Sequence, residues 1–160
     1  MNTSHSIESN SLSSEPIVVK TATCKSLSGK SNLTYHIACD SDNEVYFRVA
    51  ENSGKGFFSC EWIALTAIEA VIKDKPTMSG ITAFMFNELF TGKSVNTPAF
   101  LLAVLKAEKL VQPLPNRRRA HEVVPNNTFL DDIYRLVDTI EESNPSIPEP
   151  TSPVKSARKK

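Results

Sequence analysis

Several features of specialised proteins are missing from this 160-residue chain. The longest apolar run, residues 98–105, is only eight residues long, whereas a membrane-spanning helix needs roughly 20. The N-terminus is rich in serine and does not have the basic and then apolar pattern of a secretory signal. The three cysteines, Cys24, Cys39 and Cys60, form no CxxC pair and fit the reduced thiols of the cytoplasm better than a disulfide framework. We therefore expect a cytoplasmic protein without a membrane partner.

The composition is that of one globular domain between two atypical ends. Basic and acidic residues number 18 each, 40% of the residues are hydrophobic and 22% are charged. The first 16 residues contain six serines, and prolines recur after residue 143 before a basic C-terminus. We expect a disordered Ser-rich tail over residues 1–16, a single α+β domain over residues 17–142, and a disordered, Pro-rich basic tail over residues 143–160.

Alternating apolar residues predict an antiparallel sheet in the first half of the domain. Residues 33–39 and 44–50 alternate in this way and are separated by the turn-forming segment 40–43, which predicts a β-hairpin. Residues 17–24 and 57–58 are expected to add two more strands. The sheet then has three or four strands.

Helical spacing replaces alternation in the second half. Three helices are expected, over residues 59–73, 81–90 and 97–109. Ser59 is predicted to cap the first helix, and Thr97 to cap the third, with Pro98 in the first helical position. The predicted fold class is therefore α+β, with an N-terminal antiparallel hairpin or meander before a helical unit.

The chain beyond the third helix predicts a short hairpin and a last helix. Residues 110–112 and 121–124 read as two short strands, joined by a loop that contains Arg117, Arg118 and Arg119. Thr128 is predicted to cap a C-terminal amphipathic helix whose polar face is acidic. Residues 106–121 carry a net charge of +4, and residues 122–142 carry −5. The two segments therefore form neighbouring patches of opposite charge.

The order of three helices followed by a hairpin with a basic tip resembles the winged helix-turn-helix family. The resemblance covers about residues 62–124 and is one of fold, in the order of helices and strands. It rests on the helix that starts at Thr97-Pro98, on the exit Lys109-Leu110-Val111, and on the three arginines 117–119 at the wing tip. The resemblance implies that the third helix enters a DNA major groove and that the wing contacts phosphate or the minor groove.

The third helix offers few polar side chains with which to read bases. The part outside its wide apolar arc is Ala99, Ala103, Lys106 and Ala107, whereas base edges are read by longer polar side chains. We therefore expect binding of low sequence specificity. The expected nucleic-acid contacts are Lys93, Ser94, Asn96, Lys106, Lys109, Arg117, Arg118 and Arg119.

The sequence thus predicts a non-enzymatic nucleic-acid-binding or regulatory protein without a cofactor or a metal. The expected partner is nucleic acid, DNA in the first place, or an acidic protein surface, with a homodimer as a further option. One alternative is a protein-interaction adaptor or homo-oligomerising accessory protein, which the neutral isoelectric point of about 6.8 favours. A second alternative is a small enzyme with dispersed site residues. The arginines could also pair internally with the acidic helix at 128–142.

Two short motifs resemble parts of a phosphate-binding loop and of a zinc site but do not meet the requirements of either. Ser28-Gly29-Lys30-Ser31 lacks the first glycine of a phosphate-binding loop, because Cys24 stands there, and a strand follows where a helix is required. His36 and Cys39 are of zinc-ligand type, but positions three apart on a strand point to opposite faces. We therefore predict neither a nucleotide cradle nor a zinc site.

The run Lys55-Gly56-Phe57-Phe58 is similar to the basic and aromatic mixture with which RNA-binding sheets stack bases. It lacks the second glycine of that pattern. Two adjacent phenylalanines before a capped helix are more typical of a core anchor, with one ring on each side. We favour this structural interpretation over the RNA-binding one.

Overall fold

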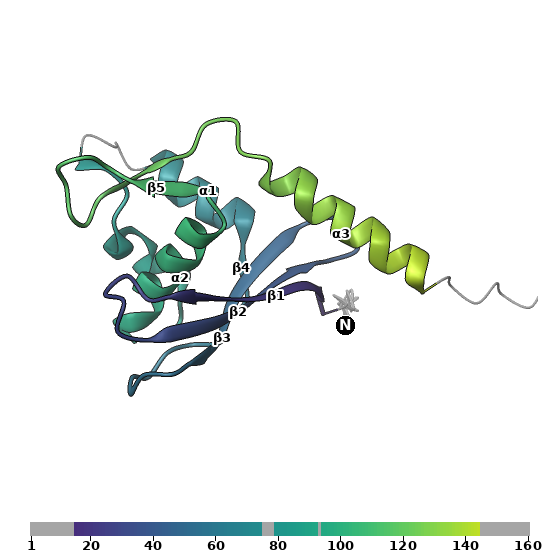
Figure 1. Cartoon of the computed structure of the whole chain (residues 1–160), viewed down its shortest axis with the longest axis horizontal. Helices are drawn as coiled ribbons and strands as arrows, with labels where there is room; N and C mark the ends of the chain where they lie inside the picture. The colour runs from purple at the N-terminus through teal and green to yellow at the C-terminus, as the bar shows by residue number, and fades with distance from the viewer. Residues whose placement is uncertain (1–14, 75–78, 93, 145–160) are drawn as a thin grey trace, which may run out of the picture.

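The computed structural model describes residues 15–74, 79–92 and 94–144 (Figure 1). Residues 1–14 and 145–160, which make up most of the two predicted tails, lie outside the described residues. Within the described part, no helix has both the length and the apolar character that crossing a bilayer requires. The fold class is α+β, as predicted, with an antiparallel meander first and helices after it.

The meander consists of four strands in the order of the chain. They are β1 (Ile17–Lys25), β2 (Asn32–Cys39), β3 (Val45–Asn52) and β4 (Ile63–Ala64). The predicted hairpin is confirmed, because β2 and β3 pair antiparallel with Ile37 opposite Phe47. The predicted strand at residues 57–58 is wrong, and β4 instead forms six residues further on.

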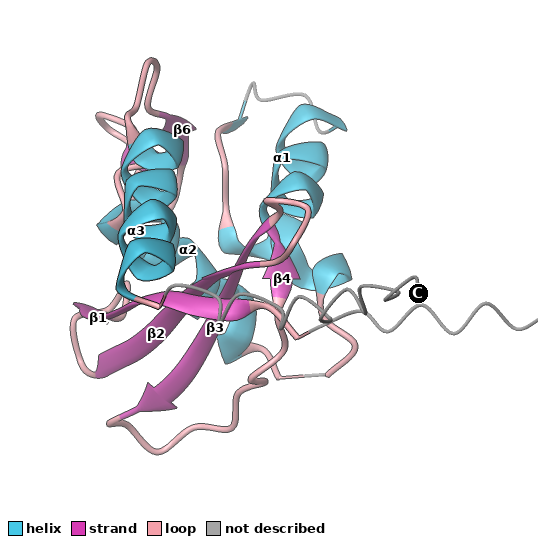
Figure 2. Cartoon of the chain, turned by 90° about the vertical axis from the view of Figure 1, so that its right-hand side faces the viewer, coloured by secondary structure: helices cyan, strands magenta, loops and turns pink. Residues whose placement is uncertain are grey.

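All described helices lie on one face of this sheet (Figure 2). They are α1 (Leu65–Asp74), the 3₁₀ helix η2 (Ala83–Leu89), α2 (Asn96–Ala107) and α3 (Phe129–Ser143). Alternation along the strands turns the fully buried Leu33, Ile37 and Phe47 toward the helices. Phe47 stacks on Phe129, with ring centroids 5.5 Å apart, and so joins α3 to the core. The opposite face of the sheet carries no described helix (Figure 2).

None of the three predicted helix caps forms a side-chain cap hydrogen bond. Thr128 lies at the N-cap position of α3 but donates to Asp132, and Ser59 and Thr97 make tertiary contacts. The Ser59 hydroxyl binds the Glu61 carboxylate, residues 63–64 pair with β3, and α1 therefore begins only at Leu65. Thr97 is buried, and its Oγ1 accepts a hydrogen bond from the Ser59 N–H at 2.9 Å. These contacts anchor the segment before β4 to the start of α2.

The predicted second helix is shorter and tighter than expected. It is a seven-residue 3₁₀ helix, η2, with Met85 and Phe86 buried. Just before it, Ile81 forms a bridge with His121, with N–H to O distances of 2.7 and 2.8 Å. The bridge places an extended segment beside the C-terminal hairpin.

The predicted hairpin forms from β5 (Val111–Pro113) and β6 (His121–Val123). Gly80 lies against it with φ +77°, and a Cβ on Gly80 would stand 2.8 Å from the Ala120 Cβ. Only glycine combines this backbone conformation with so close an approach. The hairpin is thus fixed to the helical unit.

Candidate nucleic-acid interface

The three arginines lie at the tip of the β5 and β6 hairpin. The turn is closed by a hydrogen bond from Leu114 N–H to Ala120 O at 2.9 Å. Within it, Arg117 N–H bonds to Leu114 O at 3.4 Å, and Ala120 N–H bonds to Arg117 O at 3.3 Å. Residues 117–119 are all exposed. We call these three residues the arginine tip.

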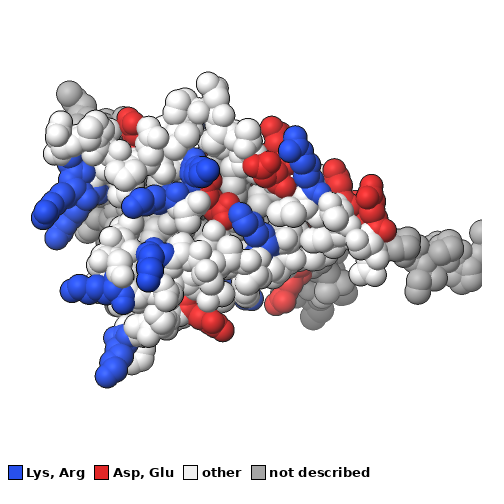
Figure 3. Space-filling model, in the orientation of Figure 1, with Lys and Arg blue, Asp and Glu red and all other residues white. Residues whose placement is uncertain are grey.

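Basic side chains gather at the end of the molecule that carries the arginine tip (Figure 3). The connection between β1 and β2 and the connection between β3 and β4 lie at this same end (Figure 1). Acidic side chains gather instead over α3, at the other end (Figure 3). We define the basic end as the exposed basic residues in or next to the three connections: Lys25, Lys30, Lys55, Arg117, Arg118 and Arg119.

Lys25, Lys30 and Lys55 are not among the predicted nucleic-acid contacts, although Lys55 belongs to the run 55–58 that is similar to an RNA-binding pattern. Lys25 and Lys30 border the β1 and β2 connection, and Lys55 lies in the β3 and β4 connection. Asn32 and Ser53 join the two connections, with Asn32 N–H to Ser53 Oγ at 2.8 Å and Ser53 N–H to Asn32 O at 2.9 Å. Lys30 and Lys55, which are 25 residues apart in sequence, therefore lie in neighbouring loops. Only the pairing of the strands shows this proximity.

The eight predicted contact residues fall into separate groups. Lys106 lies close enough to His121, the residue of β6 next to the hairpin turn, to help lower the pKa of that imidazole, for which burial is the larger cause. Lys109 is exposed at the end of α2 with φ +59°. Ser94 and Asn96 are at the opposite end of α2, about 15 Å from Lys106 by the helical rise. Lys93 lies outside the described residues.

The expectation that the third helix enters a major groove is not compatible with its burial. Eight of the twelve residues of α2 are buried, including Leu102 at 0% and Val104 at 1% exposed. The helix packs between η2 and the inner face of the sheet. The apolar arc of α2 is wide because the helix contacts the core on nearly every side.

Ser94 and Asn96 are already engaged within the chain. The Ser94 hydroxyl and the Asn96 side-chain amide both donate to the Phe57 carbonyl, the latter at 3.2 Å. These contacts fix the β3 and β4 connection to the start of α2. The two side chains therefore position that loop.

Among the described residues, Arg118 and Arg119 form no ion pair with the acidic side chains of α3. The tip and the C-terminal half of α3 lie at opposite ends of the molecule (Figure 1). On α3, Asp132 accepts from the Thr128 hydroxyl at 2.9 Å and pairs with Arg135 at 3.6 Å. Arg135 thus neutralises part of the negative charge of α3 from within the same helix.

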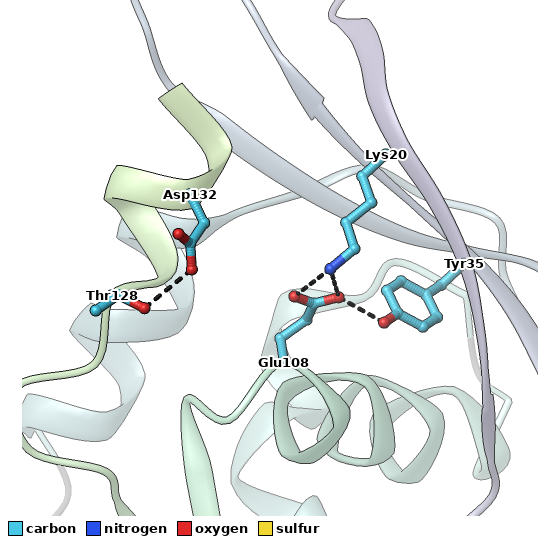
Figure 4. Close-up of polar contacts among 5 residues, drawn as sticks. All are labelled: Lys20, Tyr35, Glu108, Thr128 and Asp132. Atoms are coloured by element: carbon cyan, nitrogen blue, oxygen red, sulfur yellow. Dashed lines mark hydrogen bonds and ion pairs between the residues drawn. The ribbon is translucent and has the colours of Figure 1, made fainter. Parts of the chain in front are cut away.

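A second polar cluster lies on the inner face of the sheet (Figure 4). Lys20 Nζ is 2.8 and 2.9 Å from the two Glu108 carboxylate oxygens, and the Tyr35 hydroxyl donates to Glu108 at 2.5 Å. Burial, and then the Glu108 carboxylate, raise the pKa of Tyr35. A hollow of about 330 Å³ adjoins this cluster. Both Glu108 oxygens are occupied, so the cluster is built as an ion-pair anchor between β1, β2 and the end of α2.

The uncovered face of the sheet holds a further cluster around Arg48. Its guanidinium lies 4.3 Å from the centroid of the Trp62 ring, and its Nε donates to His36 Nδ1 at 3.2 Å. Burial, followed by the Arg48 charge, lowers the pKa of His36. Cys39 is buried on the inner face, so His36 and Cys39 point in opposite directions, as predicted.

Comparison of the chain with protein-family models, with curated proteins and with solved structures finds no match.

Proposed function

We propose that this protein binds nucleic acid, with little sequence preference, through the basic end. The observation that carries the proposal is the exposure of the arginine tip, with lysines from two other loops at the same end of the molecule (Figure 3). Arg118 and Arg119 project from a turn and have no packing role there. A guanidinium group donates two parallel hydrogen bonds to one phosphate group, which suits the sugar–phosphate backbone of a nucleic acid.

The arrangement around α2 supports a winged-helix-like unit with a changed mode of contact. Helix α1, η2, α2 and the β5 and β6 hairpin follow one another in that family's order. Because α2 is buried, the wing and the loops of the sheet are left to make the contacts. Contacts of this kind position a phosphate backbone and carry little sequence information.

The test compares two single substitutions that remove the same charge. Arg118→Ala acts at the basic end, and Arg135→Ala is its matched control on α3, where the side chain is 79% exposed. Binding of labelled random-sequence DNA, single-stranded and duplex, is measured by fluorescence anisotropy at about 50 mM salt. We expect R118A to weaken binding several-fold and R135A to leave it unchanged or slightly stronger.

Thermal unfolding of both variants serves as the control for folding. Two results would contradict the proposal: no binding of either DNA by the wild-type protein at this salt concentration, or an equal loss in R118A and R135A. An equal loss would mean that net charge, and not the basic end, governs the interaction.

A second candidate function, self-association as an interaction adaptor, is supported by α3. Only Phe129 and Ile133 of its apolar stripe are buried. Leu136 and Ile140 remain 37% and 36% exposed, and Ile17 of β1, 65% exposed, lines a hollow beside Ile140. If a second copy covers this surface, light scattering will give a dimer mass for the wild type and a monomer mass for L136E/I140E. A monomeric wild type at high concentration would exclude this candidate.

A further inference from the structure

The two adjacent phenylalanines before β4 have opposite environments. Phe58 is half-buried, with its ring centroid 6.1 Å from that of Phe100. Phe57 is 93% exposed, the largest exposed fraction among the described large apolar side chains. The predicted core anchor, with one ring on each side, is therefore formed by Phe58 alone, and Phe57 faces solvent. A polar residue would serve the fold equally well at position 57.

Hydrogen bonds hold the backbone at Phe57 in place. Its carbonyl receives two side-chain donors, from Ser94 and Asn96. Gly56 lies so close to Asn96 that an added Cβ would stand 2.7 Å from Nδ2. The exposed ring thus extends from a loop whose backbone is attached to the start of α2, so the backbone loses little conformational entropy when a ligand stacks on the ring.

Lysines lie in the loop of this ring and in the adjoining loop. Lys55 precedes Phe57 by two residues, and the Asn32 and Ser53 hydrogen bonds bring the loop of Lys30 alongside. Gly54 lies against Ser31, whose Cβ would be 3.2 Å from an added Cβ on the glycine. The exposed aromatic ring therefore belongs to the basic end.

An exposed ring among lysines matches the chemistry of an unpaired nucleotide. The face of a base stacks on the ring, and the adjoining phosphates lie near the ammonium groups. In a duplex the base faces are covered by neighbouring base pairs, so Phe57 gains nothing from duplex DNA. A protein partner would bind the ring through apolar contacts alone and would not require the neighbouring lysines.

We infer that Phe57 is a base-stacking platform and that the basic end prefers single-stranded nucleic acid to duplex. This inference rests on the proposed function and names its ligand class. Lys30 and Lys55 supply the phosphate contacts nearest to the ring, and the arginine tip supplies contacts further along the strand. Stacking accepts any base, which agrees with low sequence preference.

The experiment measures the affinity of Phe57→Ala and wild type for a short oligothymidylate and for a random-sequence duplex. Stacking on an aromatic side chain is worth about 1–3 kcal/mol per base, so F57A should lose about 5-fold to 150-fold in single-strand affinity and keep its duplex affinity. Phe84→Ala is the matched control, because Phe84 is 79% exposed on η2, which contains no lysine or arginine. F57W should bind the single strand at least as well as wild type.

The outcomes separate the inference from the proposed function. If wild type binds both DNA forms and F57A loses nothing, or loses affinity for both forms equally, the stacking inference is wrong and the proposed function stands. If F84A loses as much single-strand affinity as F57A, the platform is not at Phe57. If wild type binds neither DNA form, both proposals fail.

Discussion

The ion-pair anchor at Glu108 should contribute substantially to the stability of the fold. Glu108→Ala removes the acceptor of the Tyr35 hydroxyl, which donates at 2.5 Å, and the partner of the Lys20 ammonium group at 2.8 Å. The Glu108 side chain is only 7% exposed, whereas that of Lys20 is 36% exposed. The two partners must therefore be weighed differently.

The loss of the tyrosine contact dominates the expected effect. A hydrogen bond to a charged group contributes about 1.5–3 kcal/mol, and Tyr35, 3% exposed, would keep a buried hydroxyl without its acceptor. Lys20 remains in contact with water, so its pair with Glu108 is worth about 0.2–1 kcal/mol, as at a surface. We expect E108A to lower the free energy of unfolding by about 2–4 kcal/mol.

A double-mutant cycle in urea checks this reasoning. Tyr35→Phe removes the same hydrogen bond but leaves the carboxylate paired with Lys20, so its loss should be the smaller one, about 1.5–3 kcal/mol. The E108A/Y35F double variant should show a coupling energy of about 1–2 kcal/mol. Additive losses, or a loss below about 1 kcal/mol in E108A, would refute the view that these groups act together.

Three further predictions concern other parts of the fold. Gly80→Ala should destabilise the protein by more than about 1 kcal/mol, because φ is +77° and the new Cβ meets Ala120 at 2.8 Å; a neutral result in urea unfolding would show that the hairpin can shift. Burial and then Lys106 lower the pKa of His121, so this group stabilises the fold above pH ~6.5 and the stability is lost as the pH falls through the folded pKa; a His121→Asn variant should lack that decline in melting temperature. Hydrogen bonds from Ser59, and then from Thr91, lower the pKa of Glu61 to about 2, so its contribution is present above pH ~4.5 and disappears toward pH 2; if Glu61→Gln melts with the same acid profile as wild type, that network does not stabilise the fold.

The sheet and the hairpin were predictable because their signals are local. Alternation through residues 33–39 and 44–50 is enough to define β2, β3 and the turn between them. The apolar stripe after Thr128 defines α3 in the same way. In each case the deciding residues are neighbours in the chain.

The errors arise where distant residues decide the local structure. Ser59 and Thr97 look like helix caps, yet the Ser59 N–H bonds to Thr97 Oγ1 38 residues away, and neither side chain caps a helix. The arginine tip was visible as a run of three like charges. Lys30 and Lys55 were not grouped with it, because only the folded sheet brings their loops to one end. The exposure of Phe57 was not predicted, because the sequence does not show which of the two adjacent rings, Phe57 or Phe58, packs into the core.

The salt dependence of duplex binding tests the central claim most directly. About four phosphate contacts give a slope of roughly −3.6 in log affinity against log salt for duplex DNA. Wild-type affinity should therefore fall by about 100-fold between ~50 and ~200 mM salt, and R118A/R119A should flatten the slope by about 2. A slope near zero in the wild type, or an unchanged slope in R118A/R119A, would contradict phosphate binding by the basic end.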